Sequence, residues 1–336
     1  MQNGNGKQRR QFWLGMILSA ACLAAIFFFI EPREIVNALQ TARYGYLALS
    51  ALGVIAFLLL RAVRWRFMLN NDASWRDVFH IQNIGYFLTA ILPLRLGDVA
   101  RAVLIGNVPP ITLPRGISTM VVERVLDMLF IVTLLPFTLA GVERLPDWMR
   151  NGARVSGIAA LGAIVVLIVA ANQRPLTRRI ATAVLDRLPF LNTAVWAQRL
   201  DSLLIGLVSL TRLKDGLILI VLSVIIWLPI IFAYYTSLLA VNLQPTLVMA
   251  AFVVCAAAFS VALPSSPGQV GVFHAGVIAA LQVLNQPQAN AASFAFLYHA
   301  VNIGVVTLLG VVGIYSTGAT FRNVLASTRA FMQRGA

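Results

Sequence analysis

Two groups of charged residues interrupt apolar stretches of the chain and could bind an anion. They are Arg95, Asp98, Arg101, Glu123, Arg124 and Asp127. Arginine presents a planar fork that grips phosphate or carboxylate with two hydrogen bonds. Glu123 and Asp127 are four residues apart, share one face of a helix, and could pair with Arg95, Arg101 or Arg124. Charged groups at membrane depth are costly and usually face a bundle interior or a cavity. The pattern predicts a charge network that binds an anionic headgroup, or one that is purely structural near the cytoplasmic interface.

Uncharged polar residues form a second candidate group further along the chain. They are Ser265, Ser266, Gly268, Gln269 and His274. Hydroxyls and amides can coordinate a headgroup without charge. A histidine can relay a proton near neutral pH, although a lone histidine in an apolar helix is more often a hydrogen-bonded packing residue. Tyr298, His299 and Asn302 are better explained by interhelical hydrogen bonds.

Both candidate groups surround a matching proline-glycine bend. Thr89, Leu92, Pro93 and Gly97 recur as Ser260, Leu263, Pro264 and Gly268, offset by 171 positions. Proline removes a backbone donor, and glycine permits the reversed backbone angles of a tight bend. We expect helices to restart after Gly97 and Gly268, with free N–H groups that suit a phosphate. Paired breaks of this kind in two halves of a chain indicate a transporter's binding site, and a structural kink is the alternative.

The elements that must position these residues are membrane helices. The 336 residues are 59% hydrophobic and 11% charged, whereas soluble domains carry about 25% charged residues. A spanning helix needs ~20 apolar residues. The net charge of +14 is almost entirely arginine. We attribute it to cytoplasmic loops and anionic lipid headgroups and expect no nucleic-acid partner.

Loop charges orient the predicted helices. The apolar segments are 12–30, 46–62, 78–93, 98–106, 117–139, 155–171, 216–240, 247–263, 268–283 and 291–316. Segment 12–30 follows a basic start and predicts a retained helix or signal anchor. Basic residues place both termini and the loop 61–77 inside, while the loops 31–45, 241–246 and 284–290 can lie outside. Arg61, Arg64, Trp65 and Arg66 fit an interfacial anchor, with headgroup contact as the alternative.

This arrangement is consistent only if two segments enter and leave on one side. We therefore predict an all-α polytopic membrane protein with six spanning helices plus two re-entrant helical hairpins, 78–106 and 247–283, in an inverted repeat. The alternative lets 247–263 and 268–283 cross fully, giving eight to ten spans. The whole chain 1–336 forms one transmembrane domain with halves of about 1–154 and 155–336. The leucine- and arginine-rich stretch 172–215 predicts an amphipathic cytoplasmic linker.

Cofactor chemistry has no recognisable motif in the sequence. There is no P-loop, dinucleotide fingerprint, HExxH or GxSxG motif. Cys22 and Cys255 lie in apolar runs without metal or redox spacing. We expect no cofactor and no metal.

Four sequence blocks resemble the transmembrane region of lysylphosphatidylglycerol synthases, the flippase-like domain family. They are Arg61–Arg66, Leu92–Ala102, Val122–Asp127 and Leu263–His274. The resemblance implies movement of an anionic phospholipid or lipid-linked molecule between leaflets of the bacterial inner membrane. The soluble aminoacyltransferase domain is absent, so lipid aminoacylation is not expected. The family often has glutamate where this chain has His274, so carboxylate-dependent coupling is not expected there.

We therefore expect a lipid transporter rather than an enzyme. Membrane lipids are the expected partners, together with a possible homo-oligomer or an envelope-biosynthesis partner. Two alternatives remain open. One is a glycosyltransferase-like membrane enzyme acting on a polyprenyl-phosphate lipid, with Asp98, Glu123 or Asp127 as its carboxylate. The other is a non-transporting member of an envelope biosynthetic complex.

Overall fold

The computed structural model describes residues 3–92, 96–139, 147–173, 213–263 and 265–318, together with Arg179 and Ala183. All regular secondary structure in these ranges is helical, which confirms the predicted all-α class. Some predicted features lie outside the described residues, among them Pro93, Arg95, Pro264 and nearly all of the linker 172–215.

Three of the described helical segments are long and apolar enough to cross a membrane. They are α3 (Tyr44–Met68), α14 (Gln288–Thr317) and the stretch Lys214–Ala240. The last comprises α10 (Leu213–Ile225) and α11 (Trp227–Ala240), which are separated by a break at Ile226. A fourth candidate joins α1 (Asn3–Phe29) to α2 (Pro32–Gln40) through an 82° bend. The predicted count of six spans stays a prediction.

Helix α2 was not anticipated, because its residues belong to a segment expected to be a loop. Pro32 begins the helix, where its missing N–H would be unpaired in any case. Ile35 is buried and Ser293 of α14 donates a hydrogen bond to its carbonyl. A helix as short as α2 is stabilised by its contact with α14 rather than by the helix propensity of its own sequence.

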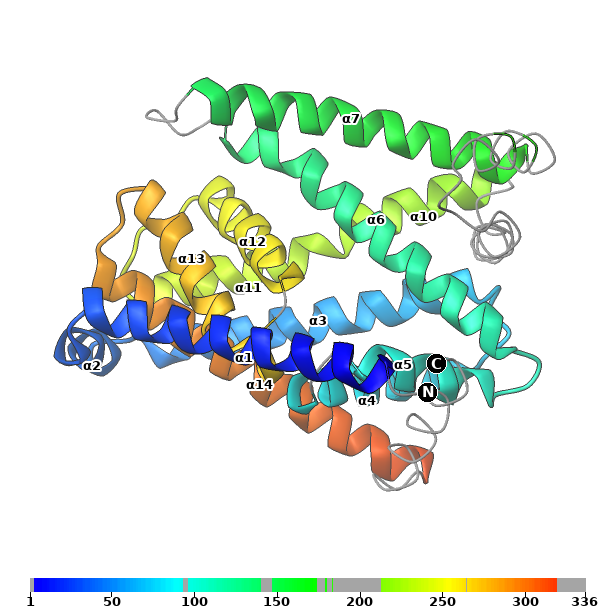
Figure 1. Cartoon of the computed structure of the whole chain (residues 1–336), viewed down its shortest axis with the longest axis horizontal. Coiled ribbons are helices and arrows are strands. Elements are labelled where there is room, and N and C mark those ends of the chain that lie inside the picture. Colours follow the sequence, from blue (N-terminus) through cyan, green and yellow to red (C-terminus); the bar gives the residue numbers. More distant parts are fainter. Residues whose placement is uncertain are drawn as a thin grey trace.

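The longest helices form a bundle around α3 and α14 (Figure 1). Helix α3 packs along α11, and α14 packs along α4 (Trp75–Ile91). Helices α6 (Leu113–Leu139) and α7 (Asp147–Asn172) contact each other and cover one side. The main hydrophobic core lies between α3, α11, α12, α13 and α14.

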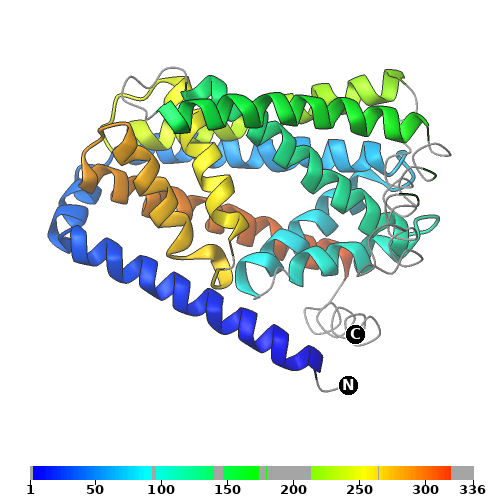
Figure 2. The same ribbon diagram turned by 45° about the horizontal axis from the view of Figure 1, so that its top comes forward.

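Two helical hairpins enter this bundle from opposite ends (Figure 2). The first consists of α4 and α5 (Leu96–Gly106), and the second of α12 (Leu247–Ala262) and α13 (Val272–Val283). Their bends meet, because α4 packs against the short turn Pro267–Gln269 of the second hairpin. A Cβ atom added to Gly268 would lie 3.2 Å from the carbonyl oxygen of Ala90.

The glycines of the two bends have different roles. This corrects the prediction that helices restart directly after Gly97 and Gly268. Gly268 adopts φ = +70°, as expected for a tight bend. Gly97, however, lies inside α5, where it is buried against Gly85 and Thr89 of α4. The first glycine therefore allows close helix packing rather than reversed backbone angles. In the second bend the helix restarts at Val272, after Gly271 at φ = +87°, and not directly after Gly268.

Helix α1 supports the second bend from outside the hairpins. The Ser19 hydroxyl accepts a hydrogen bond of 2.9 Å from the backbone N–H of Ser266. Gly15 lies against the backbone of Ser265, and Gly271 lies against the carbonyl of Ser19. The small residues of α1 thus allow its backbone to approach the bend closely.

Candidate functional site

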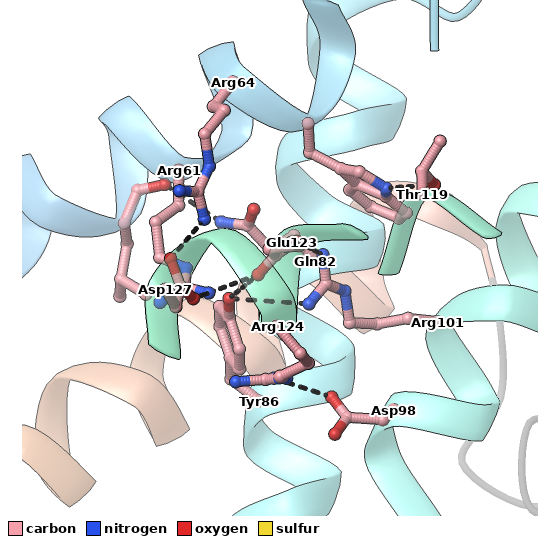
Figure 3. A network of polar contacts seen from close by, with 12 residues as sticks. Arg61, Arg64, Gln82, Tyr86, Asp98, Arg101, Thr119, Glu123, Arg124 and Asp127 are labelled. Atoms are coloured by element: carbon pink, nitrogen blue, oxygen red, sulfur yellow. Dashed lines mark hydrogen bonds and ion pairs between the residues drawn. The ribbon is translucent and has the colours of Figure 1, made fainter. Parts of the chain in front are cut away.

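Three arginines and two carboxylates form a buried charge cluster where α3, α5 and α6 meet (Figure 3). The cluster consists of Arg61, Arg64, Arg101, Glu123 and Asp127. Glu123 pairs with Arg61 through Oε1 and with Arg101 through Oε2, the latter at 3.0 Å. Asp127 accepts from Arg61 at 2.6 Å and from Arg64 at 2.7 Å. Both carboxylates therefore have both oxygens engaged by guanidinium groups.

Helix periodicity aligns the members of this cluster. Arg61 and Arg64 are three residues apart on α3, and Glu123 and Asp127 are four apart on α6. The two side chains of each pair therefore lie on the same face of their helix. Arg61 lies about 10 Å along the helix axis from the end of α3, at 1.5 Å per residue. The cluster is thus placed inside the bundle rather than at its end.

Aromatic and polar side chains hold the arginines in place. The Arg101 guanidinium carbon lies 4.3 Å from the centre of the Trp65 ring and 5.1 Å from that of Tyr86, distances typical of cation–π contacts. Trp65 donates to the Thr119 hydroxyl at 3.1 Å. The Tyr86 hydroxyl donates to Glu123 at 3.3 Å.

The cluster carries more positive charge than negative. Three arginines face two carboxylates, so its formal net charge is +1 (3 − 2). The Nε atoms of Arg61, Arg64 and Arg101 have no hydrogen-bond partner among the described residues. Buried charges are normally paired and hydrogen-bonded. An excess buried positive charge favours binding of an anion.

A central chamber of about 260 Å³ lies beside this cluster, between the two hairpins. Arg61 and Tyr86 line it from the cluster side. Gly268, Gln269 and His299 line it where the second hairpin bends. The chamber thus gives Arg61 access to a space large enough for a small headgroup.

Asp98 and Arg124 form a separate ion pair beside the cluster. Their atoms are 3.0 Å apart, and their side chains are 23% and 39% exposed. They line a mostly apolar pocket of about 280 Å³ between α5 and α6. This ion pair therefore lies at the edge of the charge cluster, whereas the sequence analysis predicted that both residues belong to the charge network.

The structure does not bring all the predicted site residues together. Arg101, Glu123 and Asp127 belong to the charge cluster, and Gly268 and Gln269 line the chamber. Gly97 serves helix packing. Ser265 and Ser266 belong to the contact with α1, and Arg95 lies outside the described residues.

His274 has a structural role in the second hairpin. Its Nδ1 accepts a hydrogen bond of 3.3 Å from the backbone N–H of Gly271, at the start of α13. Its ring stacks on that of His299, with centroids 4.7 Å apart. This geometry agrees with the packing interpretation of His274.

The sequence predicted Arg61 and Arg64 as an interfacial anchor, with headgroup contact as the alternative, and did not place them in the charge network. The interfacial-anchor interpretation was wrong for both, because they are only 6% and 0% exposed. A signal was available: arginines spaced by three on one predicted helix complement carboxylates spaced by four on another. That signal is weak without knowledge of which helices touch.

The helical fold and its buried cluster define a polytopic membrane protein with an ionic site inside the bundle. The chain belongs to the family described as the lysylphosphatidylglycerol synthase TM region, whose model matches residues 12–310. A membrane location follows from this family and from the apolar helices.

Two curated relatives illustrate the range of this similarity. A UPF0104 membrane protein of Methanothermobacter thermautotrophicus is 24% identical, over 88% of this chain and 90% of its own length. The glycosyltransferase AglD of Haloferax volcanii is 26% identical over 89% of this chain, which spans only 53% of that relative. No solved structure shows significant similarity.

Proposed function

We propose that this protein moves an anionic phospholipid or a lipid-linked molecule between the leaflets of a bacterial inner membrane. One observation carries the proposal: a buried cluster with excess positive charge contacts a chamber between two hairpins through Arg61. A headgroup phosphate at Arg61 would neutralise the excess charge of the cluster through charge-assisted hydrogen bonds.

The distribution of charge supports an orientation for this transporter. The start of α1, the end of α3 and the starts of α6 and α10 lie at one end of the bundle in Figure 1, and α2 lies at the other. The first end carries Arg66, Arg115 and Lys214 and is the cytoplasmic side by the positive-inside rule. The N-terminus would then be cytoplasmic, and we place the C-terminus there as well.

The two hairpins would be re-entrant in this orientation. Six helical segments would cross the membrane, and the hairpin bends would meet near its midplane. The contact of α4 with the turn Pro267–Gln269 supports this inverted arrangement. Rocking of the two halves would expose the chamber to each leaflet in turn while the acyl tails stay in lipid. Arg95 stays a predicted headgroup ligand at the first bend.

Arg61→Gln tests the proposal and leaves each carboxylate of the cluster with an arginine partner. The variant removes the excess charge and still leaves Glu123 with Arg101 and Asp127 with Arg64. We expect leaflet-to-leaflet transfer of anionic lipid in proteoliposomes to fall about 10-fold to 100-fold, because hydrogen bonds to charged groups contribute ~1.5–3 kcal/mol. Arg61→Lys should retain part of the activity, because it keeps the charge and loses the fork.

Arg66→Gln is the matched control on the same helix. Arg66 donates to the carbonyl of Ala73 at 3.0 Å, away from the cluster. It should transfer lipid at the wild-type rate. Full activity of a folded Arg61→Gln variant would contradict the proposed role of the cluster.

The similarity to glycosyltransferase AglD favours a second candidate, a membrane enzyme acting on a polyprenyl-phosphate lipid. The three carboxylates proposed for such an enzyme, Asp98, Glu123 and Asp127, are each ion-paired with arginine. A general base needs a free carboxylate within reach of its proton, so the pairing favours transport. Mass spectrometry of lipids incubated with the protein separates the two, since only an enzyme yields a chemically altered lipid. A homo-oligomer or an envelope-biosynthesis partner stays a prediction.

A further inference from the structure

Tyr86 of α4 connects the central chamber to the charge cluster. Its side chain lines the chamber, and the residue is only partly buried. Its hydroxyl donates to Glu123 Oε1 at 3.3 Å and accepts from an Nη atom of Arg101 at 3.4 Å (Figure 3). The centre of its ring lies 5.5 Å from the guanidinium carbon of Arg61. One side chain therefore contacts the chamber, both carboxylate-binding arginines beside it and a carboxylate.

The Glu123 oxygen that Tyr86 contacts is the oxygen that pairs with Arg61. Oε1 therefore has two donors, whereas Oε2 pairs with Arg101. The bond from Tyr86 is longer than the ~2.7–2.8 Å typical of hydroxyl donors. Tyr86 is thus the weaker of two donors to one buried oxygen, and its bond can shorten if the stronger donor leaves.

Arg61 is the arginine of the cluster that can turn toward the chamber, because its side chain lines it. It contacts both carboxylates through one nitrogen, Nη2. If Arg61 turned to a bound anion, Asp127 would keep Arg64 at its other oxygen. Glu123 Oε1 would keep Tyr86 as its donor. A buried acceptor without any donor carries the full penalty of losing its water, so Tyr86 lowers the cost of freeing Arg61.

We infer that Tyr86 is a positioning residue for anion binding: its hydroxyl takes over Glu123 Oε1 when Arg61 turns toward an anion in the chamber. The exchange breaks the contact between Arg61 and Glu123, shortens an existing hydrogen bond and moves no proton. The residue before Tyr86 supports this arrangement, because a Cβ atom on Gly85 would overlap the side chain of Arg101. This inference rests on the proposed function and adds a residue that the same site needs.

A double-mutant cycle without any ligand tests the shared oxygen. The variants of the full-length protein are Tyr86→Phe, Arg61→Met and the double variant, and the readout is the melting temperature in detergent. Arg61 still holds Oε1 in Tyr86→Phe, so we expect a small shift. Methionine cannot donate, so in the Arg61→Met background the same tyrosine substitution should lower the melting temperature at least about twice as much.

Tyr44→Phe is the matched control for the cycle. Tyr44 begins α3 and its hydroxyl donates to the backbone carbonyl of Leu39 at 3.0 Å. The substitution removes one hydroxyl hydrogen bond on the same helix as Arg61, with no partner in common with it. Its shift in melting temperature should be equal in both backgrounds. Equal shifts for Tyr86→Phe in both backgrounds would overturn the inference.

Anion binding tests the exchange itself. The probe is dioctanoyl phosphatidic acid, with binding measured by native mass spectrometry. We expect Tyr86→Phe to bind it about tenfold more weakly than wild type, because freeing Arg61 then leaves Glu123 Oε1 without a donor. Tyr44→Phe should bind it like wild type. A purely structural tyrosine would instead lower the melting temperature and leave the affinity of the folded protein unchanged.

The wild-type protein separates failure of this inference from failure of the proposed function. If wild type binds phosphatidic acid and Tyr86→Phe binds it equally well, the role of Tyr86 is refuted and the proposed function stands. If wild type does not bind the probe, the proposed function is refuted, and the role of Tyr86 with it.

Discussion

Glu123→Ala is expected to lower the free energy of unfolding by about 3–5 kcal/mol, the range for breaking a buried ion pair by removal of one partner. Glu123 is 1% exposed and pairs with Arg61 and Arg101. Its loss leaves three buried arginines facing the single carboxylate of Asp127. We expect a lower melting temperature and a reduced yield of monodisperse protein, measured by fluorescence-detected size exclusion after heating in detergent.

Asp98→Ala is the matched control for this variant. Asp98 also pairs with an arginine, but the Asp98–Arg124 pair is partly exposed. Exposed pairs contribute about 0–1 kcal/mol. If the melting temperatures of Glu123→Ala and Asp98→Ala are equally close to that of the wild type, the buried cluster contributes little to stability.

Gly97→Ala should have a comparably large effect through packing alone. A Cβ atom at this position would overlap the backbone carbonyl of Gly85 and the side chain of Thr89. A backbone oxygen inside a helix cannot move aside, so α5 must separate from α4. We expect a loss of about 1–3 kcal/mol or more, the range for overpacking a core. The same heating assay measures it, and loss of lipid transfer should accompany it because Arg101 lies on α5.

Gly304→Ala provides the control for glycine replacement in a helix. Gly304 lies in α14 with no atom within 4 Å of an added Cβ. Alanine there should be neutral or stabilise the helix by about 0.5–1 kcal/mol. Wild-type stability of Gly97→Ala would contradict the tight contact between the two arms of the first hairpin.

These predictions give the carboxylates and Arg61 of the charge cluster different roles. Glu123 and Asp127 hold α3, α5 and α6 together, since each carboxylate bridges two arginines. Arg61 alone among the three arginines also lines the chamber. The Arg61→Gln and Glu123→Ala variants should therefore show different defects. Arg61→Gln should lose lipid transport while the protein stays folded, whereas the main effect of Glu123→Ala should be a loss of stability.

Much of the architecture could be predicted from local sequence. The apolar lengths of α3, of the stretch Lys214–Ala240 and of α14 reflect the thickness of a bilayer, and this requirement acts on each segment separately. Glu123 and Asp127 share a face because helical periodicity requires it. The hairpin bend at Gly268 was predictable because a positive φ favours glycine. Such features depend on a few neighbouring residues and need no knowledge of the fold.

Tertiary structure alone decided which arginines those carboxylates meet. Arg61 and Arg64 resemble a surface anchor in sequence, and only the packing of neighbouring helices on α3 buries them. The chamber likewise draws on residues from Phe57 to Val306, and no local pattern reports their proximity. Burial and charge pairing are properties of contacts between distant segments. The sequence by itself therefore determined the helices and the charges they carry, and the packing decided which of those charges is left free to bind.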